Sequence, residues 1–310
     1  NTGSHFGDWL FYTRNDDNDG TAAITSKYLI AQCFYAHSTQ LLINAAKVLG
    51  KTEDVETYTK LLADVKNAYM REYVTPNGLI SSDTQTAYAE ALEFDMLPEN
   101  LRAQAADRLA ANIRRYGNHL TTGFLGTPYL CSALSRFGHT DDAFKLLLQE
   151  NYPSWLYPVK MGATTIWERW DGIKPDGTLE VPSMNSYNHY AYGAIGDWMY
   201  RTVAGIDTKV DQPGYKGIII KPTVGGNLTD VKADYETPYG KASSHWKIEN
   251  GNFVLDVVIP ANTTATVYVP TKGDSAVTES GKSVTKASDQ IAGYTAVKVG
   301  SGTYHFSTTN

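Results

Sequence analysis

Two blocks between residues 164 and 191 gather the residue types that can carry out chemistry. The first, TTIWERWDG (164–172), places a glutamate, an arginine and an aspartate among tryptophans, and the second, MNSYNHYA (184–191), contains a histidine. A carboxylate such as Glu168, flanked by Trp167 and Trp170, would be partly desolvated, which suits general acid or base work. These blocks interrupt the helical pattern around them, and loops on a rigid scaffold commonly carry functional groups. Hydrolysis assisted by carboxylates is the chemistry that they favour.

Each of these residues also has a purely structural interpretation. Glu168 could form an ion pair with the neighbouring Arg169, and the pattern gives this alternative about equal weight. Asp171 precedes Gly172, so a turn is the favoured interpretation there. His189 is expected to open the last helix of its region, where it could bind a substrate hydroxyl or be satisfied by backbone groups.

A second polar and aromatic pair, Asp8-Trp9, lies in an irregular segment near residue 1. We expect Asp8, Trp9, Trp167 and Trp170 to take part in substrate binding, since indole rings present flat apolar faces that suit sugars. The run Asp16-Asp17-Asn18-Asp19-Gly20 resembles part of a calcium loop but lacks its distal glutamate, and a solvated loop is favoured over a metal site. Motifs for nucleotide cofactors, serine nucleophiles and zinc are absent from the sequence, so no cofactor is expected.

Composition excludes several partner classes. The chain has 310 residues and a formal net charge of −6, without basic runs that could follow a phosphate backbone, so nucleic acid is not expected as a partner. No segment approaches the roughly 20 apolar residues that would cross a bilayer, and no signal-peptide pattern follows Asn1. Cys33 and Cys131 lie in apolar helical segments and are predicted to be buried thiols.

A series of helices is predicted from about residue 24 to 205, and these helices must position the two blocks. Apolar residues recur every three or four positions in the first, which ends at Gly50, and Thr52 is expected to cap the second. Later helices are expected from the capping box 82–85, from Pro98 to Gly117, from Thr127-Pro128, and over about 186–204.

The turn LGKTED (49–54) returns as FGHTDD (137–142), which indicates a repeated αα-hairpin. The irregular period favours a closed α/α barrel over a regular solenoid. After Gly205 short β-rich runs follow, and Asn250-Gly251 between two of them predicts a tight hairpin. We therefore expect a helical domain at 1–206 and an antiparallel β-sandwich at 207–310.

Four blocks, LTTGFLGTP (120–128), YPSWLY (152–157), GATTIWERWDG (162–172) and MNSYNHYA (184–191), resemble the C-terminal part of the bacterial α-L-rhamnosidases of glycoside hydrolase family 78. The resemblance extends from GDWL (7–10) to about Pro270. It implies an α/α six-hairpin barrel followed by a β-sandwich, and inverting hydrolysis of α-L-rhamnosides by two carboxylic acids. It also implies that Glu168 is the general base and that His189 contacts rhamnose hydroxyls.

One part of the family pattern is missing. The general acid of the family lies in a motif of the form D-x-x-x-R-D/E-R-x-G-W before the GDWL segment, and these 310 residues do not contain it. A complete barrel also needs about twelve helices, and about seven are predicted. We therefore expect a C-terminal portion of a rhamnosidase, an incomplete toroid that is inactive by itself and associates into a homo-oligomer through exposed apolar faces.

Alternatives from other classes stay open at this point. The chain could be a carbohydrate-binding module without turnover, a structural portion of a larger protein, or another α/α-barrel glycosidase. An acid within the chain, such as Asp8, Asp16 or Asp171, could also replace the missing proton donor.

Overall fold

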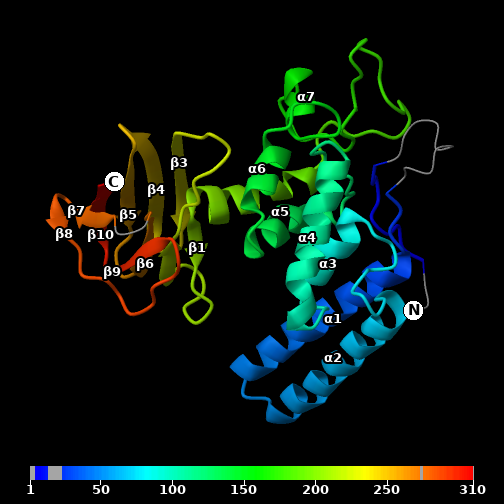
Figure 1. Cartoon of the computed structure of the whole chain (residues 1–310), viewed down its shortest axis with the longest axis horizontal. Helices are drawn as coiled ribbons and strands as arrows, with labels where there is room; N and C mark the ends of the chain where they lie inside the picture. Colours follow the sequence, from blue (N-terminus) through cyan, green and yellow to red (C-terminus); the bar gives the residue numbers. More distant parts are fainter. Residues whose placement is uncertain (1–3, 13–22, 273–274, 310) are drawn as a thin grey trace. The chain divides into compact units, whose positions relative to one another are not determined.

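The computed structural model describes residues 4–12, 23–272 and 275–309, and the chain divides into two compact units, Asn1–Ile195 and Gly196–Asn310 (Figure 1). The first unit is helical and the second consists mainly of strands. The acidic run at 16–20 lies outside the described residues.

The first unit is built from successive helical hairpins. Helix α1 pairs with α2, α3 with α4, and α5 with α6, while α1, α3, α5 and the short helix η1 contact one another in sequence. This places alternate helices in an inner row, each with an outer partner, as in an α/α toroid. The bounds are α1 (Lys27–Val48), α2 (Thr52–Tyr73), α3 (Gln85–Glu93), α4 (Glu99–Arg115), α5 (Thr127–Arg136), α6 (Thr140–Leu147), α7 (Leu156–Lys160) and η1 (Ala191–Ala194).

Burial separates the inner helices from the outer ones. In α3 every residue from Gln85 to Leu92 is buried, whereas α2 buries Leu62, Val65 and Tyr69 and exposes its other side. A helix buried all round must be covered on several sides, while an amphipathic helix is covered on one. Cys33 on α1 and Cys131 on α5 are free and buried, as predicted.

The predicted hairpin turns are confirmed, with shifts in the caps. Gly50 and Gly138 take positive φ of 66° and 86°, which a glycine adopts at little cost. Thr84 caps α3 by accepting a hydrogen bond from the Ala87 N–H. The prediction that Thr52 and Thr127 are caps is wrong, because each is the first residue inside its helix.

The predicted helix over 186–204 is also wrong over its first part. Regular structure begins at η1 and continues through α8 (Ile195–Trp198) and the wide-turned η2 (Met199–Ala204), which ends at Gly205. Residues 186–189 form no helical turn because the N–H groups of Ser186 and His189 donate to acceptors some 20 positions earlier in the chain. Backbone donors used in this way are not available to start a helix.

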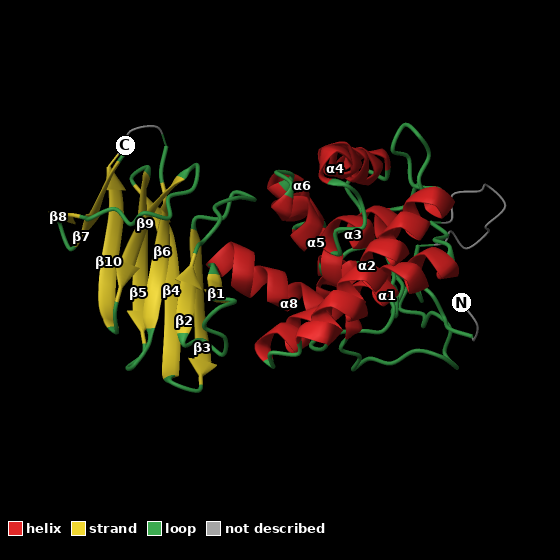
Figure 2. Cartoon of the chain, turned by 90° about the horizontal axis from the view of Figure 1, so that it is seen from below, coloured by secondary structure: helices red, strands yellow, loops and turns green. Residues whose placement is uncertain are grey.

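The second unit contains two sheets, with strand orders β1-β2-β6-β9 and β3-β4-β5-β10-β7-β8 (Figure 2). All pairings are antiparallel except that of β2 with β6, which is parallel. The β4–β5 hairpin turns at Asn250-Gly251, both with positive φ, as predicted. The bounds are β1 (Ile206–Thr208), β2 (Gly217–Ile220), β3 (Asp230–Thr237), β4 (Gly240–Glu249), β5 (Asn252–Ile259), β6 (Thr264–Pro270), β7 (Ala276–Glu279), β8 (Lys282–Ser283), β9 (Tyr294–Val299) and β10 (Gly302–Thr309).

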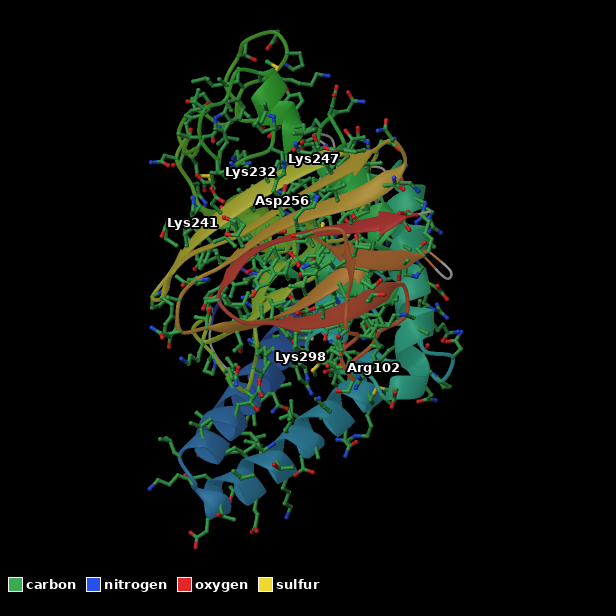
Figure 3. All side chains as sticks on the ribbon, turned by 90° about the vertical axis from the view of Figure 1, so that its left-hand side faces the viewer. Arg102, Lys232, Lys241, Lys247, Asp256 and Lys298 are labelled. Carbon is green, nitrogen blue, oxygen red and sulfur yellow. The ribbon has the colours of Figure 1, made fainter. Side chains whose placement is uncertain are left out.

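The six-stranded sheet has one buried face and one charged face. Along β4, Ala242, Ser244 and Trp246 are buried, and the residues between them are more exposed. The charged face carries Lys232, Lys241, Lys247 and Asp256 (Figure 3). Most of its basic side chains have a carboxylate partner, for example His305 Nδ1 with Asp256 Oδ1 at 2.7 Å, so the face has mixed charge.

Among the described residues, no helix has both the length and the apolar character that crossing a membrane requires.

Candidate active site

A short backbone ladder brings the two chemistry-bearing blocks together. The Glu168 N–H donates to the Ser186 carbonyl at 2.8 Å, and the Ser186 N–H donates back to Glu168 Oε2 at 2.9 Å. The His189 N–H donates to the Ile166 carbonyl at 2.8 Å. Residues 166–168 and 186–189 therefore run side by side, which holds Glu168 and His189 on two neighbouring backbone segments.

Glu168 is half-buried and anchored through one oxygen only. Oε2 accepts the Ser186 N–H, and no described residue hydrogen-bonds Oε1 or forms an ion pair with this carboxylate. The alternative of an ion pair with Arg169 is contradicted, because the Arg169 guanidinium donates to the Met184 carbonyl at 3.2 Å. A carboxylate that is held at one oxygen and open at the other can accept a proton from a water molecule.

His189 is oriented from two directions. Its ring stacks on Phe124 at a centroid distance of 4.8 Å and an interplanar angle of 26°. Nδ1 accepts the Ala191 N–H at 3.3 Å, so in the neutral ring the proton is on Nε2. The ring is half-buried, and no described residue accepts a hydrogen bond from its Nε2–H.

Phe124 and Trp9 belong to an apolar hollow lined by His5, Phe6, Gly7, Trp9, Phe124 and Leu125, with a volume of about 470 Å³. Trp9 is 38% exposed and lies edge-on to Phe6. The lining therefore includes a partly exposed indole and the Phe124 ring, on which His189 stacks. This is the kind of surface on which the apolar side of a sugar packs.

The other two tryptophans contradict the expectation that they stack on sugar. Trp167 and Trp170 are only 5% and 7% exposed. Trp170 stacks on Tyr192 at 3.8 Å and meets Trp155 edge-on, while Trp167 lies edge-on to Tyr187. Their ring faces are used in packing the loop that carries Glu168.

Asp8 also differs from its expected role as a direct substrate ligand. Its carboxylate is buried, and four donors occupy both oxygens: the N–H groups of Gly123, Leu125 and Gly126 at 2.8–2.9 Å, and the Thr86 hydroxyl. Burial raises the pKa of Asp8, and these four hydrogen bonds oppose the rise. No oxygen is left over for a ligand.

Asp171 lies in the turn that the sequence favours, closed by the Gly172 N–H donating to the Arg169 carbonyl at 3.2 Å. It lines a polar pocket with Tyr152, Arg169 and Glu180 that shares no residue with the apolar hollow. Burial, together with the negative charge of Glu180, raises the pKa of Asp171.

Sequence reasoning did not single out Phe124, although the block LTTGFLGTP around it was noted. The glycine on its N-terminal side gives the clearest signal. A Cβ at Gly123 would lie 2.2 Å from the Trp9 carbonyl oxygen and 2.5 Å from that of Asp8, so only glycine fits. Two close glycines before a predicted helix are thus the signal from which close packing against this loop could have been expected.

Comparison with known proteins gives a consistent result. Residues 1–203 match the family model described as the bacterial α-L-rhamnosidase six-hairpin glycosidase domain, and residues 205–284 match that of the bacterial α-L-rhamnosidase C-terminal domain. An α-L-rhamnosidase of Streptomyces avermitilis is 41% identical over 97% of this chain, and one of Formosa agariphila is 45% identical over 86%. The alternative of a different α/α-barrel glycosidase is excluded.

Solved structures agree with this assignment. The crystal structure of the Streptomyces avermitilis enzyme complexed with L-rhamnose has a TM-score of 0.89 and 40% identity, and covers 99% of this chain. The Aspergillus terreus α-L-rhamnosidase structure has a TM-score of 0.86 at 35% identity, covering 97% of this chain and 33% of that chain. This chain spans 28% of the length of both the Streptomyces and the Formosa relatives. The chain belongs to the bacterial α-L-rhamnosidase family of glycoside hydrolases.

Proposed function

We propose that this chain supplies the general base and part of the sugar pocket for inverting hydrolysis of terminal α-L-rhamnosides. The observation that carries the proposal is the environment of the Glu168 carboxylate. Ser186 anchors this carboxylate through Oε2 and Oε1 is left open, and the backbone segment that carries His189 runs alongside. In this mechanism Glu168 Oε1 takes a proton from water as the water attacks the anomeric carbon. A second carboxylic acid protonates the leaving oxygen.

His189 and the apolar hollow bind the rhamnose unit. The His189 Nε2–H donates to a ring hydroxyl, and the Trp9 and Phe124 side chains contact the apolar side of the sugar. Rhamnose is a deoxy sugar, so it presents a methyl group and C–H surface together with three free hydroxyls. An apolar hollow next to a single oriented donor suits that mixture of surfaces.

The proton donor is proposed to come from the family motif that these 310 residues lack. Of the acids considered within the chain, Asp8 has both oxygens occupied, and Asp171 lies in the separate polar pocket. Inversion places the two carboxyl groups roughly 6.5–9.5 Å apart, which leaves room for the water.

Assays of the 310-residue chain and of a full-length rhamnosidase that contains it test the proposal. We expect the full-length protein to hydrolyse a rhamnosyl disaccharide, and the 310-residue chain to bind rhamnose with no measurable turnover. Proton NMR of the first product should show the anomer opposite to that of the substrate. Retention of configuration would require a nucleophile and reject the base assignment, and disaccharide turnover by the short chain would place the acid within it.

A further inference from the structure

We propose that Asp8 is a positioning residue that sets the orientation of His189 through the Phe124 loop (residues 123–126). Asp8 does not contact the sugar in this scheme. The inference rests on the proposed sugar contact of His189 and adds the device that holds this histidine in place.

The first step is the clamp between Asp8 and the loop. Oδ1 accepts the N–H groups of Leu125 and Gly126 at 2.8 and 2.9 Å, and Oδ2 accepts that of Gly123 at 2.8 Å and the Thr86 hydroxyl. Three backbone donors that converge on one buried carboxylate fix the loop as a unit, because losing any one leaves a buried group unpaired.

The second step is the close packing of this loop on the segment around Asp8. The Phe124 N–H donates to the Trp9 carbonyl at 2.9 Å, and no side chain fits at Gly123 against the carbonyls of Asp8 and Trp9. The position of Phe124 is therefore tied to that of Asp8 and Trp9, so the loop cannot shift independently of them.

The third step runs from Phe124 to the histidine. The Phe124 ring carries the stacked His189 ring on one side and meets Tyr192 edge-on, with centroids 5.2 Å apart. The Tyr192 hydroxyl in turn donates to the Leu10 carbonyl at 3.2 Å. The Phe124 backbone and the hydroxyl of its ring neighbour Tyr192 are thus hydrogen-bonded to Trp9 and Leu10, so moving this segment moves the surface on which His189 rests.

A matched control exists in the same unit. Asp142, on α6, is equally buried at 2% exposed and accepts hydrogen bonds from Arg114 and Lys145. No hydrogen bond or ring contact connects it with Phe124 or His189 among the described residues. Asp142→Asn therefore removes another buried, hydrogen-bonded carboxylate, this one paired with cationic side chains, without affecting the proposed path.

The first experiment needs no ligand. The imidazole NMR signals of His189, assigned with His189→Ala, are shifted by the ring current of Phe124 and report their stacking. Asp8→Asn should move these signals and Asp142→Asn should not. Thr86→Val, which removes one of the four donors, should move them in the same direction by less, and it serves if Asp8→Asn does not fold. Unchanged His189 signals in folded Asp8→Asn or Thr86→Val would overturn the proposal.

The second experiment is a double-mutant cycle on rhamnose affinity of the 310-residue chain. Asp8→Asn should weaken rhamnose binding about tenfold in the wild-type background and by clearly less in the His189→Ala background, where only the sugar contacts of Trp9 and Phe124 are left to disturb, because coupled residues are not additive. An equal loss in both backgrounds would contradict action through His189. If wild type fails to bind rhamnose, the proposed function fails, and the ligand-free signals still decide the positioning role.

Discussion

Asp8 and Glu168 are two carboxylates beside tryptophans, yet they occupy opposite kinds of environment. Asp8 is 3% exposed with four donors on its two oxygens, and Glu168 is half-buried with one donor on one oxygen. A carboxylate whose acceptor sites are all used by the chain holds structure together, whereas one with a free oxygen can exchange a proton with water. The number of donors that reach each oxygen separates the two roles.

The largest expected effect is on turnover at Glu168. In a full-length rhamnosidase containing this chain, Glu168→Gln should lower kcat by about two to four orders of magnitude, the range that general-base catalysis supplies. Rhamnose affinity should change much less, because the amide keeps the shape of the carboxylate. Steady-state kinetics and calorimetry on both proteins measure the two quantities, and near-wild-type kcat in the variant would remove Glu168 from the mechanism.

For Asp8 the large effect is expected on the stability of the fold, not on turnover. Asp8→Ala leaves three backbone N–H groups without their acceptor, two of them in the buried residues Gly123 and Gly126, so the free energy of unfolding should fall by roughly 3–5 kcal/mol. Glu168→Ala removes one partly exposed acceptor and should cost about 1 kcal/mol or less. Urea unfolding followed by tryptophan fluorescence compares them. Equal losses of stability in the two variants would contradict the distinction between the structural carboxylate of Asp8 and the open carboxylate of Glu168.

His189 is expected to show an intermediate effect on ligand binding. His189→Ala removes the Nε2–H donor, and rhamnose binding should weaken by about 1–3 kcal/mol if the partner hydroxyl stays unpaired. Calorimetry with L-rhamnose measures the change, and His189→Gln, which keeps a donor, provides the control. A histidine with a structural role alone would leave the affinity of folded His189→Ala at the wild-type value.

The smallest expected effect concerns Glu90 on α3, a third carboxyl with a third environment. It is fully buried, and no hydroxyl, amide or cationic group of the described residues hydrogen-bonds its oxygens; the weakly donating Cys33 thiol lies against it. Burial, with the nearby charge of Asp8, raises the pKa of Glu90 well above its usual value of 4.5. Its neutral form is therefore the one that folding favours.

The sign of the pH dependence follows from linkage. Because the folded protein holds this proton more tightly than the unfolded chain, Glu90 lowers the free energy of unfolding progressively as pH rises above about 4.5, until it ionises in the folded state. Glu90→Gln should remove this contribution and be more stable than wild type at pH 8, by about 1 kcal/mol. Urea unfolding of both proteins from pH 5 to 8 measures the difference, and a difference independent of pH would contradict it.

The helical hairpins could be predicted because their signals are local. Gly50 and Gly138 mark the same turn twice, and apolar residues recur every three or four positions in the first helix. The Asn250-Gly251 hairpin is a local signal of the same kind. The resemblance carried by the loop blocks then identified the family.

The environment of the site residues depended on contacts that are distant in sequence. Residues 186–189 form no helical turn because they pair with residues 166–168, and no periodicity within 186–204 reveals that partner. Asp8 finds its donors some 115 residues later, in a loop whose glycines only show that something packs against it. Trp167 and Trp170 looked like binding residues by type, but each had a packing partner further along the chain.

The most direct test of Glu168 as general base is the product formed with azide. Glu168→Ala leaves space where the base stood, and azide attacks without needing a proton removed, so adding it to the variant in a full-length rhamnosidase should restore cleavage of an activated aryl α-L-rhamnoside. Proton NMR should show that the product is β-L-rhamnosyl azide, with inverted configuration. An α-azide, or no rescue in a variant that still binds rhamnose like the wild type, would contradict the assignment of Glu168.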